Sequence, residues 1–154
     1  MIKNENGLSL LEVLIALVIF SFGLLGIAAL MAKGLQYNTS ALHRSYAVTQ
    51  AYDMADRMRA NQLGLAAGNY NSITGAGVTD PGCIATAAGC SPAQMAQYDA
   101  WQWNTDTLSA SNAVLLPGGS GTVSTAGGVY TITVIWDDDH DGAADDNFIF
   151  QFQP

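Results

Sequence analysis

Residues 8–31 read LSLLEVLIALVIFSFGLLGIAALM, an almost uninterrupted apolar run whose only ionisable side chain is that of Glu12. As a helix this run is about 36 Å long, enough to cross a hydrocarbon core of about 30 Å with some tilt. A secretory signal has a shorter apolar region and a small-residue cleavage site. Ala28, Ala29 and Ala32 imitate such a site, so a cleaved signal stays open as an alternative. The run predicts a transmembrane anchor.

A charge costs about 2.5–3.5 kcal/mol at the centre of a bilayer and less near its interface. The presence of Glu12 in the apolar run therefore indicates that this residue has a functional role. Gly7 ends a short polar leader just before the apolar run. A cut between Gly7 and Leu8 would therefore leave the hydrophobic helix on the mature protein. The alternative is a plain signal anchor, in which Glu12 lies near the lipid headgroups without further role.

The N-terminal segment resembles the prepilin leader of type IV pilins and of the pseudopilins of type II secretion. The matching residues are Gly7 at the cut, Leu8 as mature N-terminus where Phe is more usual, and Glu12 as fifth mature residue. The resemblance implies a membrane peptidase that cuts after Gly7 and methylates the amine of Leu8. It also implies that Glu12 guides assembly, since the N-terminal amine of a neighbouring subunit can compensate its buried charge.

Beyond Lys33 the helix is expected to continue to residue 62. Apolar residues recur there at steps of three and four, the pattern of a helix with one buried face: Ala41, Val48, Ala51, Tyr52, Ala55 and Met58. No proline interrupts residues 8–61. The sequence therefore predicts a leader over residues 1–7 and one long helix over residues 8–62, with its membrane-spanning part at 8–31.

Residues 63–154 predict a small globular domain. Its first part, residues 63–90, is rich in Gly, Ala, Asn and Thr, which predicts an irregular connection. The sequence SPAQ at residues 91–94 is typical of a helix start, with Ser as N-cap and Pro in the first turn. The apolar residues of this short amphipathic helix are Met95, Tyr98, Trp101 and Leu108. Trp101 and Trp103 are interpreted as packing residues and not as a ligand platform.

The rest of the domain predicts an antiparallel sheet. A weak strand is expected at residues 121–125, a Gly127-Gly128 turn after it, a strong strand at residues 129–136 and another at residues 147–152. One face of this sheet is heavily apolar, and its natural partner is the second half of the long helix. The predicted fold class is α+β, a type IV pilin-like long N-terminal helix packed on a small antiparallel β-sheet.

Cys83 and Cys90 are the two cysteines of the chain. On a chain that crosses into an oxidising compartment they most simply form one disulfide. A metal site at these cysteines has no nearby histidine to support it. Two free thiols stay open as the alternative.

An acidic loop follows the strong strand. Carboxylates stand at positions one, three, five and nine of this loop with glycine at six, which is the oxygen-rich spacing of calcium loops. The predicted ligands are Asp137, Asp139, Asp141, the backbone carbonyl of Ala143, and Asp145. Phe148 stands where an EF-hand needs Glu, so the prediction is a weak calcium site of another kind. The alternative is a solvated acidic turn that keeps sheet edges from pairing indiscriminately.

Charge and composition exclude other classes of function. The formal net charge of −8 repels phosphate backbones, so no nucleic-acid partner is expected. The two histidines, His43 and His140, have no evident nucleophile with an orienting acid. The sequence therefore predicts a protein that is not an enzyme.

Downstream residues extend the resemblance to the type IV pilus modification proteins of the PilV family. They are the two cysteines, the helix with its Trp pair, LPGGSG at residues 116–121 and IWDD at residues 135–138. The resemblance implies a minor pilin that helps to initiate pilus assembly, in a tip complex with other minor pilins and an adhesin. Further partners would be the prepilin peptidase, major pilins and the inner-membrane assembly platform. The chain would be held in the inner membrane with its C-terminal domain in the periplasm, and would lie in the surface pilus after assembly.

Two other functions stay open. A minor pseudopilin of a type II secretion system would share the anchor and the fold. A membrane-anchored calcium-binding module would never enter a filament.

Overall fold

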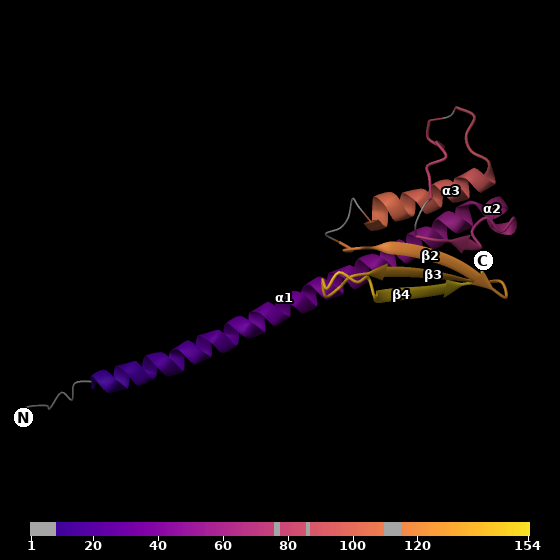
Figure 1. The fold of residues 1–154 in the computed structure, drawn as a ribbon. Coiled ribbons are helices and arrows are strands. Elements are labelled where there is room, and N and C mark those ends of the chain that lie inside the picture. Colours follow the sequence, from indigo (N-terminus) through magenta and orange to yellow (C-terminus); the bar gives the residue numbers. More distant parts are fainter. Residues whose placement is uncertain (1–8, 76–77, 86, 110–114) are drawn as a thin grey trace, which may run out of the picture. The chain divides into compact units, whose positions relative to one another are not determined.

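A computed structural model describes residues 9–75, 78–85, 87–109 and 115–154 (Figure 1). Its helices are α1 (Leu10–Ala60), α2 (Gln62–Ala66), α3 (Pro92–Gln102) and the π-helical segment η1 (Trp103–Ser109). Its strands are β1 (Ser72–Ile73), β2 (Ser120–Ala126), β3 (Val129–Trp136) and β4 (Asp146–Phe152). The chain divides into two units, Met1–Thr39 and Ser40–Pro154.

Helix α1 is continuous over 51 residues and belongs in part to each unit. It begins where the carbonyl of Ser9 accepts the N–H groups of Glu12 and Val13, at 3.0 and 3.2 Å. An 18-residue window of the helix has a mean hydropathy of 2.8, and none of that window is buried in the protein. By length and composition α1 can cross a membrane.

The sheet has the order β1-β2-β3-β4, and each neighbouring pair is antiparallel. Gly127 and Gly128 join β2 to β3 with φ of 59° and 80°, so the turn pairs Ala126 with Val129. Both positive φ values are required by the two-residue turn that matches the twist of the strands, and glycine adopts them without steric cost. Side chains of β3 alternate between half-buried and buried, as the alternating sequence predicts.

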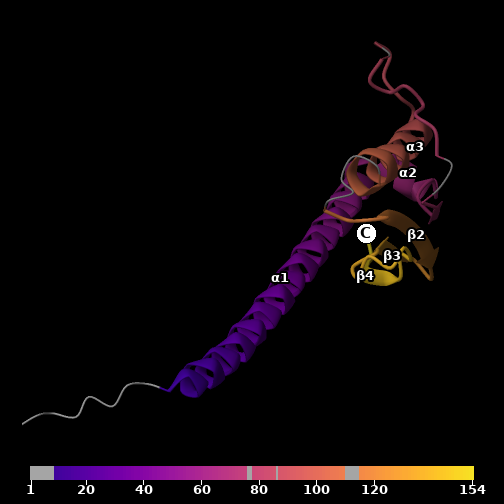
Figure 2. The ribbon, with the colours of Figure 1, turned by 60° about the vertical axis from the view of Figure 1, so that its left-hand side comes forward.

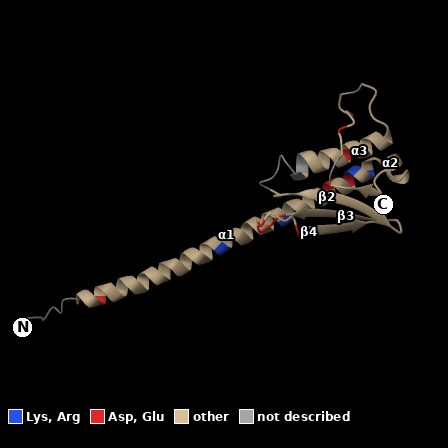
Figure 3. Ribbon diagram, viewed as in Figure 1, with Lys and Arg blue, Asp and Glu red and all other residues tan. Residues whose placement is uncertain are grey.

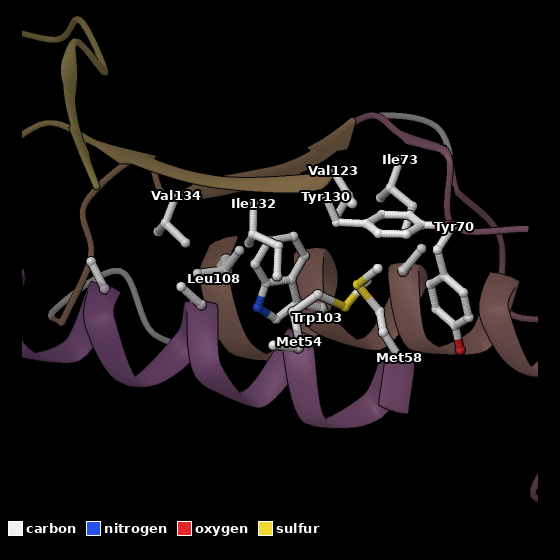
Figure 4. Packing of buried hydrophobic residues seen from close by; sticks show 14 of the residues in the cluster. Met54, Met58, Tyr70, Ile73, Trp103, Leu108, Val123, Tyr130, Ile132 and Val134 are labelled. Carbon is white, nitrogen blue, oxygen red and sulfur yellow. The ribbon is translucent and has the colours of Figure 1, made fainter. Parts of the chain in front are cut away.

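The core of the Ser40–Pro154 unit lies between the apolar face of this sheet and the helices α1 and α3 (Figures 2 and 4). Trp103 is fully buried at its centre, and its indole N–H donates to the carbonyl of Gln50 on α1, 3.1 Å away. Met54 and Met58 of α1 pack in the same cluster. The predicted α+β fold, a long helix on an antiparallel sheet, is confirmed.

The buried face of α1 differs in part from the one that the apolar spacing predicts. Ala51, Ala55 and Met58 are buried, but Ala41 and Tyr52 are exposed. Val48 is half-buried. The buried residues of the helix are His43, Ala47, Gln50, Ala51, Met54, Ala55 and Met58. Apolar spacing misplaced the face because it treats His and Gln as solvent-facing residues. Here Asp138 accepts a hydrogen bond from buried His43, whereas Gln50 is buried with its side-chain oxygen lacking a hydrogen-bond partner among the described residues.

Two further expectations were wrong in part. The buried residues of α3 are Ala96, Asp99 and Ala100, while Met95 is 36% exposed, because small side chains let the helix lie close to its neighbours. Trp103 and Leu108 are buried as expected, but on η1 and not on the helix itself. The segment expected to be irregular contains α2 and β1, whose formation depends on a cap at Asn61 and on pairing with β2.

Candidate functional site

Glu12 lies in the first turn of α1, where the helix dipole favours a negative charge. Its apolar neighbours on one side of the helix are Val13, Ala16, Leu17 and Phe20. Residues 13–32 carry no charge, and this uncharged stretch separates Glu12 from Lys33 (Figure 3). Gly7 and Leu8, the predicted cleavage and methylation residues, lie outside the described residues.

The exposed surface of this part of α1 is apolar along its length, with Leu10, Phe20, Phe22 and Leu30 between 64 and 78% exposed. Such a surface is stable in lipid or against other apolar helices, and not in water. A single carboxylate in it is an acceptor for one positively charged group. An N-terminal amine of a neighbouring helix is a group of that kind.

The acidic loop, residues 137–145, joins β3 to β4. Asp137 accepts the N–H groups of Asp141 and Gly142 at 3.1 and 3.0 Å, and Asp141 accepts the N–H of Ala143 at 2.8 Å. Asp139 accepts the N–H of Asp141 at 3.3 Å. The carboxylates therefore shape the turn through its own backbone, in which Gly142 has φ 94°.

The loop brings three of the five predicted calcium ligands together. One oxygen each of Asp137, Asp139 and Asp141 lie within 4.8 Å of one another. Asp145 is exposed and lies outside this group, and the carbonyl of Ala143 accepts the N–H of Asp145 at 3.1 Å. The Asp141 N–H lowers the pKa of Asp139, but the nearby carboxylates of Asp141, Asp145 and Asp137 raise it above its ordinary value. Mutual repulsion of this kind is what a bound cation relieves.

Asp138 has a different role from the other aspartates of the loop. Its Oδ1 accepts the Nδ1–H of His43 at 2.8 Å and the indole N–H of Trp136 at 3.2 Å, and its Oδ2 accepts the hydroxyl of Ser40 at 2.5 Å. His43 is only 1% exposed. This cluster, the Asp138 clasp, fastens the acidic loop to α1 within the Ser40–Pro154 unit.

Burial of the Asp138 carboxyl favours a higher pKa, but the hydrogen bonds from Ser40, His43 and Trp136 outweigh it and lower the pKa below the ordinary value. Sequence reasoning missed this clasp, although strand alternation contained a signal for it. Continued beyond Trp136, the alternation of β3 places Asp138 on the face that packs on α1.

A second polar network joins α1, α3 and the segment that follows α1. The hydroxyl of Tyr70 donates to Asp99 Oδ2 at 2.5 Å and accepts from Asn61 Nδ2 at 3.0 Å. Arg57 Nη1 lies 3.6 Å from Asp99 Oδ1. Burial raises the pKa of Asp99, although Tyr70 and Arg57 act to lower it. These groups satisfy one another, so the network is a structural joint.

Cys83 and Cys90 form the predicted disulfide, with their Cα atoms 5.3 Å apart. The bond closes the exposed loop just before α3. Ser91 begins that helix with the expected capping box: its hydroxyl accepts the N–H of Gln94 at 3.3 Å, and the Gln94 side chain accepts the N–H of Ser91 at 3.0 Å. The disulfide at Cys90 therefore lies directly before the N-cap of α3, Ser91.

Two family models match the N-terminal part and the middle of the chain. Residues 2–28 match the model of the prokaryotic N-terminal methylation motif, and residues 29–101 match the model of type IV pilin Tt1218. No curated protein and no solved structure matches the chain significantly. These consecutive matches, and a long helix packed on an antiparallel sheet, make the chain similar to type IV pilins in its N-terminal motif and in its fold.

Proposed function

We propose that this protein is a pilin, and specifically a minor subunit of a type IV pilus that helps to initiate pilus assembly in a tip complex with other minor pilins and an adhesin. The observation that carries the proposal is the matched N-terminal motif on a helix whose uncharged membrane-length stretch follows one carboxylate, Glu12. A prepilin peptidase would cut after Gly7 and methylate Leu8. The apolar helix then holds the subunit in the inner membrane until it is extracted into the fibre.

Glu12 selects its neighbour in the fibre through charge. A carboxylate buried among apolar helices is costly unless a positive group compensates it. The methylated amine of Leu8 on the next subunit supplies that group, so that each incoming subunit is held at a defined height. The C-terminal domain stays outside the helical core and contacts tip partners.

The minor role and the tip position rest on the resemblance to the PilV family. It is carried by the cysteine pair, the Trp pair, and residues 116–121 and 135–138. Gly121 of this set accommodates Trp103 in the core, where a Cβ at residue 121 would overlap the Trp ring. This contact supplies a physical reason for glycine at that position.

Intact mass and N-terminal sequencing of the membrane protein, with and without prepilin peptidase, test the proposal. We expect a methylated Leu8 start that depends on the peptidase. A start at Met1 in both strains, or a cut near Ala32, would overturn it. Deletion of the gene then separates a pilus from type II secretion, because loss of piliation and twitching supports the minor pilin and loss of protein export supports the pseudopilin.

A separate proposal is that the acidic loop binds calcium weakly, with a Kd of about 10⁻⁴–10⁻³ M. The three carboxylate oxygens within 4.8 Å of one another support it. Thermal unfolding of the full chain in detergent is the test. We expect millimolar CaCl₂, and not MgCl₂, to raise the midpoint of the parent protein and to leave an Asp139→Asn/Asp141→Asn variant unchanged. An unchanged parent midpoint would make the loop a solvated acidic turn.

A further inference from the structure

Strand β4 is an edge of the sheet, since it pairs with β3 alone among the described strands. The Gly127-Gly128 turn makes Ala126 and Val129 a hydrogen-bonded pair, and the direction of backbone groups alternates along each strand from there. Even-numbered residues of β4 therefore bond to β3. The residues that point their N–H and C=O groups away from β3 are Asn147, Ile149 and Gln151.

These outward residues are accessible. Ile149 is 55% exposed, and Asn147 and Gln151 are exposed as well. The strand lacks the features that usually protect an edge, because Asp146–Phe152 contains no proline and no lysine and its register with β3 is unbroken. The opposite edge, β1, has only two residues. β4 is thus the edge that can accept another strand.

The side chains beside this edge favour an apolar partner on the helix-facing side. Phe148 and Phe150 are half-buried, and the ring of Tyr52 on α1 lies 4.6 Å from that of Phe150. Tyr52 is itself 48% exposed. A strand added to β4 would place every second side chain against these aromatic rings and cover them.

Charge is distributed unevenly along the edge (Figure 3). Six aspartates lie in residues 137–146, at the beginning of β4. At its end the guanidinium of Arg59 lies 4.9 Å from the centre of the Phe152 ring. A partner strand is therefore favoured when its basic residues lie next to the acidic loop. In an antiparallel arrangement, which continues the pattern of the sheet, this is the C-terminal end of the added strand.

We propose that β4 accepts an extended segment of a neighbouring pilin subunit, with alternating apolar residues and a basic C-terminal end, as an additional antiparallel strand. The identity of the partner as a pilin rests on the proposed function. Backbone hydrogen bonds to the three outward residues supply affinity, and the aromatic rings and the acidic loop supply specificity and direction.

Site-specific photo-cross-linking in the producing cells tests this edge. The full chain carries benzoylphenylalanine at residue 151, in backgrounds with Ile149→Pro or Ile149→Ala. Proline removes an N–H that points away from β3, which an edge strand tolerates, while alanine keeps it. We expect the Ile149→Ala protein to retain an adduct with a pilin through a segment that ends in Lys or Arg. Ile149→Pro should reduce the yield of that adduct about tenfold. Proline removes a backbone hydrogen bond to the added strand, and its ring blocks the position that this strand would occupy.

Thermal unfolding verifies that each variant is folded, and Asn147→Pro replaces Ile149→Pro if the latter unfolds. An equal adduct in both backgrounds, no adduct at residue 151, or an adduct only with a second copy of this chain would overturn the proposal. The N-terminal mass of the same samples separates the two proposals. An N-terminus at methylated Leu8 without an adduct would overturn only the proposed partner of β4. An N-terminus at Met1 would overturn the proposed pilin function.

Discussion

Neighbouring aspartates in residues 137–141 accept hydrogen bonds from different parts of the protein. Asp137, Asp139 and Asp141 accept backbone N–H groups of their own loop. Asp138 points the other way and accepts hydrogen bonds from Ser40 and His43 of α1. One residue of an acidic run thus joins elements that are nearly a hundred positions apart in the sequence.

Asp138→Asn is expected to lower the free energy of unfolding by about 1–3 kcal/mol, because buried His43 loses its charged partner. Urea titration of the full chain in detergent measures the change. Asp145→Asn, at an exposed position of the same loop, is the matched control and should change stability by less than about 0.5 kcal/mol. Equal stability of the two variants would show that the clasp contributes nothing.

The clasp also predicts a pH dependence. Because the pKa of folded Asp138 lies below its ordinary value, the carboxyl stabilises the fold above the ordinary pKa near 3.9, and this stabilisation is lost as the pH falls toward the folded pKa. The difference in stability between the parent and Asp138→Asn should therefore shrink below about pH 4. Urea midpoints at pH 3 to 7 measure it, and a difference that grows on acidification would contradict the assignment.

At the scale of elements, β2 and η1 pack closely against each other at Gly121. Asn104 of η1 accepts the N–H of Gly121 at 2.7 Å and donates to its carbonyl at 3.1 Å. The rings and methyl groups of Trp103 and Leu108 occupy the space where a side chain at residue 121 would lie. The π-helical turn and the strand therefore depend on the absence of one Cβ.

Gly121→Ala is expected to destabilise the fold by about 1–3 kcal/mol, because Trp103 must move away from its place in the core. Chemical denaturation followed by Trp fluorescence measures this change. Thr122→Ala, at the next and exposed position of β2, should stay within about 0.5 kcal/mol of the parent. A Gly121→Ala protein as stable as Thr122→Ala would mean that the core has room at this point.

At the scale of the whole molecule, one continuous helix serves two environments. Its first part has apolar side chains that are exposed in the isolated chain, and its second part carries the buried residues that face the sheet and α3. Under the proposed function, membrane residence and filament packing would use the first part. Folding of the domain uses the second, so the two tasks can be disturbed separately.

Glu12→Ala is expected to leave membrane insertion intact, because it makes the apolar run more apolar, and to reduce incorporation into sheared pili at least about tenfold. Immunoblots of membranes and sheared filaments measure both. Ser21→Ala in the same helix is the matched control. If Glu12→Ala entered filaments to the same extent as Ser21→Ala, the proposed role of Glu12 in assembly would be wrong.

Local patterns in the sequence alone were enough for the membrane-length helix, the capping box of α3, the two-glycine turn and the alternation of β3. Each of these depends on residues within a few positions of one another, so composition and spacing determine it. The candidate site at the N-terminus is of the same kind, since Gly7, Leu8 and Glu12 are close in sequence.

Only the tertiary structure decided which face of α1 is buried, that small residues line the buried side of α3, and that Asp138 holds His43. Most buried polar side chains have a hydrogen-bond partner, and the partner of His43 lies 95 positions further along the chain. Whether a large or a small side chain faces a neighbouring helix likewise depends on how close that neighbour lies. The hydrophobicity of the sequence does not show which distant residue will lie next to His43, nor how close a neighbouring helix will pack. Both are determined by the tertiary packing.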